Sequence, residues 1–209
     1  MNHLNNLTDV EKFISTTDLT TLKRDELLEL NLITDELKRR KLQGECRENF
    51  LTFVRTMWSS FIEGAHHRIM CEQFNKIAKG ELKRVIINMA PRHSKSEMSS
   101  YMLPSWLLGI RPDLKIIQAT HTGELAVRFG RKVRDLVDTR EYKEIFPNVS
   151  LRADSKAAGR WETTEGGEYF ASGVGGAITG RGADILIIDD PHSEQDALSE
   201  TAMEMAYEW

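Results

Sequence analysis

Short apolar runs set between longer segments of helical pattern constrain the fold of this chain most strongly. Three such runs stand out, at residues 85–89, 115–119 and 185–188. Each has the length of a strand, and a run without polar alternation is typical of a parallel strand buried on both faces. We therefore expect an α/β fold with a mainly parallel sheet.

The segments between these runs support that interpretation. A helix is predicted after the second run, because apolar residues recur there every three or four positions: Leu125, Phe129, Val133 and Leu136. A hairpin is predicted where residues 160–163 and 168–171 flank the pair Gly166-Gly167.

The first 60 residues have a different pattern of apolar and polar residues and are predicted to form a helical lead-in. Thr8 and Glu11 fit a capping box, and helices are expected over residues 22–42 and 46–60. Two interpretations of this lead-in remain open: packing against the rest of the domain, or a dedicated arm that binds a partner. The domain of interest then spans residues 61–209.

Composition excludes some classes of protein. No apolar run among the 209 residues approaches the roughly 20 needed to span a bilayer, and the first residues lack the basic flank and apolar core of a signal peptide. An intracellular protein is therefore expected. Cys46 and Cys71 have neither metal-type nor redox-type spacing and are expected to be reduced thiols. The net charge of −4 does not indicate DNA binding, so any DNA contact has to be local or built by an assembly of subunits.

The segment after the first apolar run has the context of a phosphate-binding loop. Lys95 and Ser96 stand where such a loop places the lysine that neutralises the β- and γ-phosphates and the hydroxyl that binds Mg²⁺. Met89 and Ser94, however, occupy the two positions where the standard pattern has glycine. A side chain at a position of positive φ costs about 1 kcal/mol, so we expect altered loop geometry or weakened nucleotide binding. A chance Lys-Ser pair after an apolar run is the alternative.

Two carboxylates follow the third apolar run. Asp189 and Asp190 match the acids that end a strand in P-loop ATPases, the first in the Mg²⁺ shell and the second polarising the attacking water. Asp189 comes 94 positions after Lys95, which leaves room for an intervening strand and helix. The alternative is a buried strand that ends in two solvated acids. Together the two motifs favour a nucleotide hydrolase.

With both motifs in hand, the sequence resembles the ATPase domain of phage and prophage terminase large subunits. Four ordered blocks carry the resemblance: APRHSKSE (90–97), FGRKVR (129–134), SGVGGAITGRGAD (172–184) and LIIDDP (186–191). The resemblance covers roughly residues 60–209 and implies a P-loop NTPase fold of the ASCE type. The family's loop already lacks the first glycine, whereas Ser94 is this chain's own departure.

The resemblance also implies roles for single residues. Gln73 is implied to contact adenine, with a solvated helix glutamine as the alternative. Arg92 is implied to touch the γ-phosphate. Arg181 is our candidate for an arginine finger that reaches a neighbouring subunit's ATP, with an ion pair to Asp184 as the alternative and with Arg128 and Arg131 as further candidates. The implied nucleotide-binding set is Gln73, Pro91, Arg92, His93, Ser94, Lys95 and Ser96, the implied catalytic set is Arg92, Arg181 and Asp190, and the implied Mg²⁺ ligands are Ser96 and Asp189. The histidine spacings fit no metal site.

As a whole, the resemblance implies a motor that uses ATP and Mg²⁺ to move double-stranded DNA into a procapsid. Such motors assemble as homo-oligomeric rings on the portal protein in the host cytoplasm, with a small terminase subunit recruiting the DNA. The sequence stops about 19 residues after Asp190, before the family's coupling motif and nuclease. We therefore expect nucleotide contacts without independent translocation or cleavage. A non-catalytic fragment that docks on terminase or portal partners, and another P-loop DNA translocase, remain as alternatives.

Overall fold

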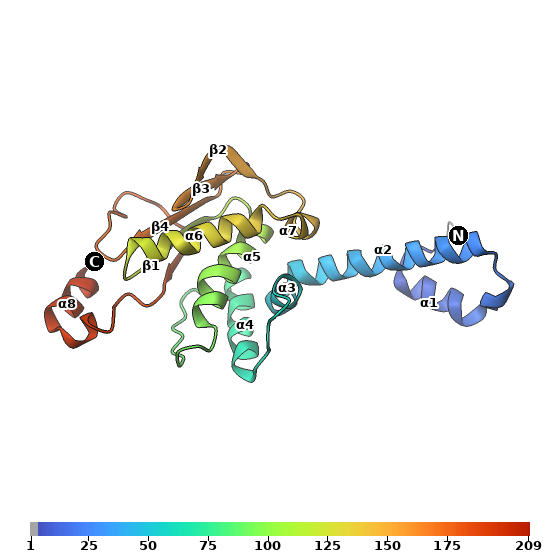
Figure 1. Ribbon diagram of the computed structural model, residues 1–209, viewed down its shortest axis with the longest axis horizontal. Helices are drawn as coiled ribbons and strands as arrows, with labels where there is room; N and C mark the ends of the chain where they lie inside the picture. Colours follow the sequence, from blue (N-terminus) through green and yellow to red (C-terminus); the bar gives the residue numbers. More distant parts are fainter. Residues whose placement is uncertain (1–3) are drawn as a thin grey trace.

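A computed structural model describes residues 4–209 and shows a mixed five-stranded sheet flanked by helices (Figure 1). The strands are β1 (Lys115–Thr120), β2 (Leu151–Ala157), β3 (Arg160–Thr163), β4 (Glu168–Gly173) and β5 (Ile185–Ile188). The α-helices are α1 (Leu7–Thr16), α2 (Arg24–Glu48), α3 (Phe50–Met57), α4 (Ala65–Ala78), α5 (Leu103–Ile110), α6 (Gly123–Val137), α7 (Arg140–Ile145) and α8 (Glu200–Glu208). Shorter helical turns are η1 (Leu19–Thr21), the π-helical η2 (Glu97–Met102) and η3 (Asp196–Leu198).

The sheet has the strand order β2-β3-β4-β1-β5. β1 pairs in parallel with β4 and with β5, whereas β3 pairs antiparallel with both β2 and β4. The strands predicted around residues 115–119 and 185–188 and the hairpin at Gly166-Gly167 are confirmed. The expectation of a mainly parallel sheet is wrong, because the hairpin strands add two antiparallel pairs and because the first expected strand does not form.

That missing strand is residues 85–89, predicted to be buried and parallel. In the structure this segment is extended but unpaired, and the Ile86 side chain is 88% exposed. Residues of this segment and of β5 together line two cavities, of about 140 and 410 Å³. Within the described part of the chain, no backbone hydrogen bond joins the two segments. β5 is consequently an edge strand, and its Leu186 and Ile188 side chains are about half exposed rather than buried.

The helical lead-in divides into two parts. α3 and the last turns of α2 pack into the main core through Cys46, Phe50 and Phe53, as expected of a segment that packs against the domain. α1 packs instead on the first half of α2, in a small separate cluster with Val10 and Leu30 at its centre. This hairpin of α1 and α2 extends away from the sheet (Figure 1).

Two predicted helix boundaries in the lead-in are wrong. The first helix starts one residue before Thr8, and the side chain of Asn6 rather than Thr8 caps it by accepting the backbone N–H of Asp9. Cys46 belongs to the end of α2 instead of starting the next helix. Asn49 forms the break, because its extended backbone ends α2 and its side chain accepts the N–H of Thr52 to begin α3.

The helix predicted from Leu125 to Leu136 is confirmed as α6, and it packs directly on β1 and β4. The contact is close because Gly130 faces the hairpin: its carbonyl accepts the indole N–H of Trp161 at 3.1 Å. The rings of Trp161 and Tyr169, on neighbouring antiparallel strands, stack with centroids 5.2 Å apart. α6 and the hairpin therefore form one packed unit beside β1.

Both cysteines are free and buried in the main core, which agrees with the reduced thiols expected from their spacing. Burial raises the pKa of the Cys46 thiol and raises that of Cys71 to about 12. Within residues 4–209, none of the helices combines the length and the apolar character that crossing a membrane requires.

Candidate functional site

The 90–96 loop and the residues after β5 meet at a cavity of about 400 Å³. Loop residues line most of it, and Asp190 lines it from the sheet side. Its volume lies within the range of about 300–1,000 Å³ usual for small-molecule sites. The cavity therefore joins the two motifs that the sequence places 94 positions apart.

The loop carries unused hydrogen-bond donors next to this cavity. Among the described residues, no acceptor is found for the backbone N–H groups of residues 92–97, which lead into η2. Free amides at the start of a helix attract anions, because the donors and the helix dipole act together. Arg92 and Ser94 both have positive φ, 63° and 65°, so the chain curls back here. The loop has the donor set of a phosphate cradle, although no strand precedes it.

Ser94 has a positive φ, the backbone conformation for which the standard pattern places glycine at this position; altered loop geometry or weakened nucleotide binding stays a prediction. A left-handed backbone conformation costs a residue other than glycine about 1–2 kcal/mol. Replacement by glycine removes this cost, but it also gives the unfolded chain more freedom, which offsets about 0.4–1 kcal/mol of the gain in stability. We expect Ser94→Gly to raise the free energy of unfolding by about 0.5–1 kcal/mol, measured by urea denaturation. Ser94→Ala, which keeps the Cβ, is the matched control and should leave stability nearly unchanged. Equal stability of the glycine and alanine variants would show that the loop is not strained at this position.

Lys95 connects the loop to both carboxylates. Its Nζ lies 3.2 Å from Oδ1 of Asp189 and also pairs with Oδ1 of Asp190. Although burial opposes the charged ammonium, the hydrogen bonds and charges of the two aspartates outweigh it and raise the pKa of Lys95 above its ordinary value. In this state the lysine acts as the internal counterion of the two acids.

The two aspartates are held differently. Asp189 is buried, with 5% of its surface exposed, and its Oδ2 accepts a hydrogen bond from the Ser100 hydroxyl at 2.8 Å. Asp190 is exposed and has a positive φ of 45°. Its carbonyl accepts the backbone N–H of His121, which ties the end of β5 to the end of β1. The buried carboxylate of Asp189 is thus held in place by the fold, while the exposed carboxylate of Asp190 faces the cavity.

The glycine-rich segment between β4 and β5 packs against the start of α6. A Cβ on Gly173 would lie 2.5 Å from the backbone nitrogen of Gly123, so only glycine fits there. Trp209, at the end of α8, donates its indole N–H to the carbonyl of Gly176 at 2.8 Å. Asp184 accepts the backbone N–H of Lys115, which aligns the segment with β1.

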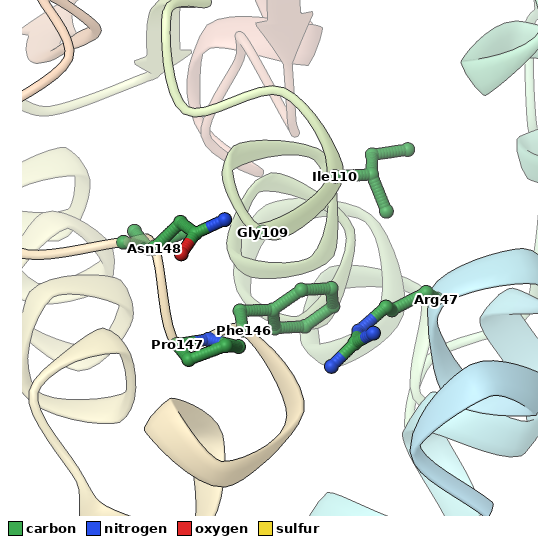
Figure 2. A pocket seen from close by; sticks show the side chains of 7 residues that line it. Arg47, Gly109, Ile110, Phe146, Pro147 and Asn148 are labelled. Carbon is green, nitrogen blue, oxygen red and sulfur yellow. The ribbon is translucent and has the colours of Figure 1, made fainter. Parts of the chain in front are cut away.

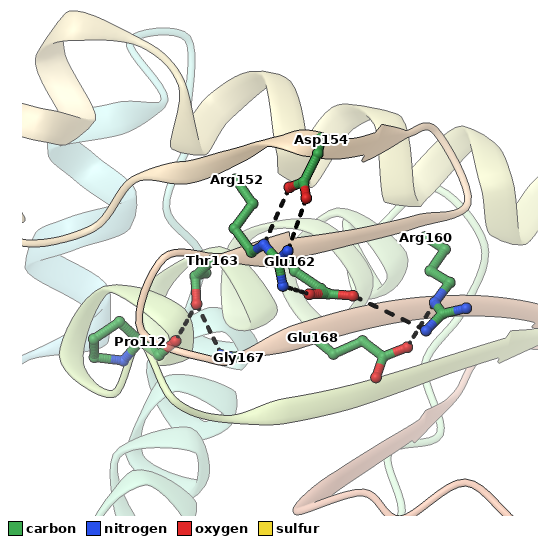
Figure 3. Close-up of polar contacts among 8 residues, drawn as sticks. All are labelled: Pro112, Arg152, Asp154, Arg160, Glu162, Thr163, Gly167 and Glu168. Atoms are coloured by element: carbon green, nitrogen blue, oxygen red, sulfur yellow. Dashed lines mark hydrogen bonds and ion pairs between the residues drawn. The ribbon is translucent and has the colours of Figure 1, made fainter.

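Arg181 does not pair with Asp184, so the alternative reading of this arginine is wrong. It pairs instead with Glu168 on β4 at 3.1 Å and lies over the ring of Phe170 at 3.9 Å. Glu168 also binds Arg160, and the chain of ion pairs continues across β3 and β2 (Figure 3). Arg181 does not line the 400 Å³ cavity, and its role as an arginine finger toward a neighbouring subunit stays a prediction.

The other residues suggested by the sequence are spread around this centre. Arg92 lines the cavity. Gln73 lies on α4, partly buried, and does not line the cavity. Arg128 and Arg131 are exposed on α6.

Histidines connect the start of α4 to the loop. The Nε2 atoms of His66 and His67 are 3.1 Å apart, and the His66 ring contacts His93, whose Nδ1 is 2.8 Å from the carbonyl of Pro91. Burial, followed by the neighbouring His66, lowers the pKa of His67. Within the described chain no group of three or more His, Cys, Asp or Glu side chains could hold a metal ion.

A separate cavity of about 340 Å³ lies where α2 meets the ends of α5 and α7 (Figure 2). Phe146 and Pro147 line it, and Arg47 is the charged residue on its wall. The Nε of Arg47 donates to the carbonyl of Ile145 at 2.6 Å, which fastens α2 to the body. We interpret this cavity as a joint between helices, because the titratable groups gather at the 90–96 loop instead.

Sequence reasoning missed two contacts at the site. Ser100 holds Asp189, and Lys132 on α6 forms an ion pair with Glu97 at 2.7 Å at the beginning of η2. Ser100 stands four positions after Ser96, about one helical turn further on. This spacing was the signal in the sequence that could have placed Ser100 near the site. The Lys132–Glu97 pair joins two of the sequence blocks, 90–97 and 129–134.

The chain was compared with known proteins. Neither the models of protein families nor the curated proteins compared with the chain gave a match.

Proposed function

We propose that this chain is a Mg²⁺-dependent ATP-binding and hydrolysing module, of the kind found in motors that package viral DNA. One observation carries the proposal: Lys95 in the donor-rich 90–96 loop directly contacts the two carboxylates that follow β5. A cation, free amides and two acids in contact with that cation are the groups that phosphoryl transfer requires.

The residues of the loop bind and orient the phosphates. The N–H groups of residues 92–97 donate to phosphate oxygens, and the guanidinium of Arg92 adds positive charge on the exposed side. Incoming phosphate draws Lys95 away from Asp189 and Asp190, because a multiply charged anion attracts the ammonium more strongly. The fold then keeps Asp189 in place, while Asp190 becomes free to act.

Asp190 is the general base in this proposal. Once Lys95 has moved to the phosphates, the exposed Asp190 carboxylate accepts a proton from the water that attacks the γ-phosphorus. The P–O bond to the departing ADP breaks as the new bond forms, and inorganic phosphate is released. Arg92 and Lys95 stabilise the negative charge that develops on the transferred group.

The donor set also fits a magnesium ion. Mg²⁺ prefers oxygen ligands and keeps several waters, and the Ser96 hydroxyl with Oδ1 of Asp189 would supply two such oxygens next to the phosphates. Bound there, the ion would neutralise phosphate charge. Among the described residues the Ser96 hydroxyl has no hydrogen-bond partner, so it is available for this role.

The packaging role rests on the four sequence blocks that resemble terminase large subunits. Three of them meet at the site: the 90–97 block forms the loop, the 186–191 block supplies the acids, and Lys132 of the third pairs with Glu97. By this proposal the chain works with double-stranded DNA, a portal protein and a small terminase subunit, as part of a ring.

The proposal is tested by measuring ATP binding to the purified chain by calorimetry, with Mg²⁺ and then with EDTA. We expect saturable binding that weakens markedly when Mg²⁺ is removed. A folded chain that binds no nucleotide at millimolar ATP would reject the ATPase and favour the second candidate, a non-catalytic fragment that docks on terminase or portal partners. The strain at Ser94 and the unpaired 85–89 segment are the observations in favour of that candidate.

A further inference from the structure

We infer that Ser100 is a positioning residue for the metal-binding carboxylate, an inference that rests on the proposed ATP and Mg²⁺ site. Its hydroxyl donates to Oδ2 of Asp189 at 2.8 Å, and both side chains are buried, Ser100 completely. The hydroxyl does not reach the cavity, so Ser100 acts through Asp189 and not on the substrate.

The two oxygens of Asp189 have different partners. Ser100 binds Oδ2 from the inside, while Lys95 lies 3.2 Å from Oδ1 on the side of the loop. A carboxylate held at one oxygen cannot rotate freely, so it presents the other oxygen in a fixed direction. Ser100 thereby makes Asp189 a ligand with one available oxygen, the one that Lys95 covers in the absence of nucleotide.

The local helix geometry brings Ser100 to this position. Residues 97–102 are wound as a π-helix, and the N–H of Leu103 bonds to the carbonyl of Met98. A π-helical turn is rare and is frequently found at functional sites. The neighbouring Ser99 points its hydroxyl to the carbonyl of Lys95 instead. Ser100, rather than Ser99, is thus the serine of this turn whose hydroxyl binds Asp189.

Residues that orient a metal ligand from behind affect metal binding strongly. Their loss typically weakens metal affinity about 10- to 100-fold. We expect Ser100→Ala to raise the Mg²⁺ concentration needed for half-maximal ATP binding by about 10- to 100-fold. ATP affinity measured in EDTA should stay within about 2-fold of the wild type, because the loop amides and Lys95 are untouched.

The matched control is Ser105→Ala. Ser105 is also completely buried, one turn further along, but its hydroxyl donates to the backbone carbonyl of Tyr101. It should leave the Mg²⁺ dependence unchanged. Ser100→Cys keeps nearly the same size with a weaker donor and should give an intermediate shift; it also decides the question if Ser100→Ala does not fold.

The experiment measures binding of a fluorescent ATP analogue against free Mg²⁺ for the wild type and the three variants, with Mn²⁺ binding without nucleotide followed by electron paramagnetic resonance. A shift confined to metal dependence in the Ser100 variants supports the inference. Unchanged metal dependence, or an equal loss of affinity with and without metal, overturns it. If the wild type itself binds no nucleotide, the proposed function fails instead, and the two failures are thereby distinguished.

Discussion

Lys95→Ala should weaken binding of ATP with Mg²⁺ by about 10- to 100-fold, because hydrogen bonds to charged groups contribute about 1.5–3 kcal/mol. The lysine is the cation that lies between the 90–96 loop and the two acids. Without it, phosphate would approach Asp189 and Asp190 with no intervening positive charge. Calorimetric titration of the variant with ATP and Mg²⁺ measures the effect.

The control for this variant is Lys83→Ala. Lys83 is an exposed lysine just before the unpaired 85–89 segment and does not line the cavity, so its removal changes the net charge equally. We expect its ATP affinity to stay within about 2-fold of the wild type, because surface charges distant from a ligand are screened by salt. Equal losses in both variants would mean that general charge, rather than Lys95, determines binding. Urea unfolding of each variant shows whether the fold is retained.

Gly130→Ala should destabilise the protein by about 1–3 kcal/mol, the usual cost of forcing an extra carbon into a packed core. An added Cβ would lie 2.6 Å from the carbonyl oxygen of Ala158 and 3.0 Å from the ring of Tyr169. α6 would have to move away from the hairpin, which would also stretch the hydrogen bond from Trp161. The free energy of unfolding in urea measures the loss.

Gly44→Ala is the matched control, since Gly44 also lies within a helix but has no atom within 4 Å of an added Cβ. Alanine is the better helix former by about 0.5–1 kcal/mol, so this variant should become more stable. Opposite signs for the two substitutions are the expected result. If both stabilised the protein, the close contact between α6 and the hairpin would not exist in solution.

The sequence predicted those elements whose pattern is local. α6 has apolar residues at helical spacing, the hairpin has its Gly-Gly turn, and β1 and β5 are apolar runs, so each could be found without the fold. The strand at residues 85–89 could not be decided in this way. An apolar run becomes a strand only where a neighbour offers hydrogen bonds, and among the described residues no backbone hydrogen bond joins this segment to β5.

The candidate site was predictable to a similar extent. Lys95, Asp189 and Asp190 were found because their spacing from apolar runs carries information, and the positive φ of Ser94 followed from the glycine that it replaces. Ser100 and the partner of Arg181 were not found. Side-chain contacts between different elements depend on how those elements pack against each other, and a single sequence does not state that packing. The pairing of Arg181 with Glu168 depends in the same way on how the segment before β5 lies against β4.

In the proposed function, the 90–96 loop and the acids after β5 form one ATP site. Its most direct test is a titration of the ¹⁵N-labelled chain with ATP and Mg²⁺, followed through the backbone amide resonances. We predict that the largest saturable shifts occur at residues 92–97 and at Asp189 and Asp190. Saturable shifts confined to other regions, such as the cavity around Arg47 and Phe146, or no shifts at millimolar ATP, would contradict the claim.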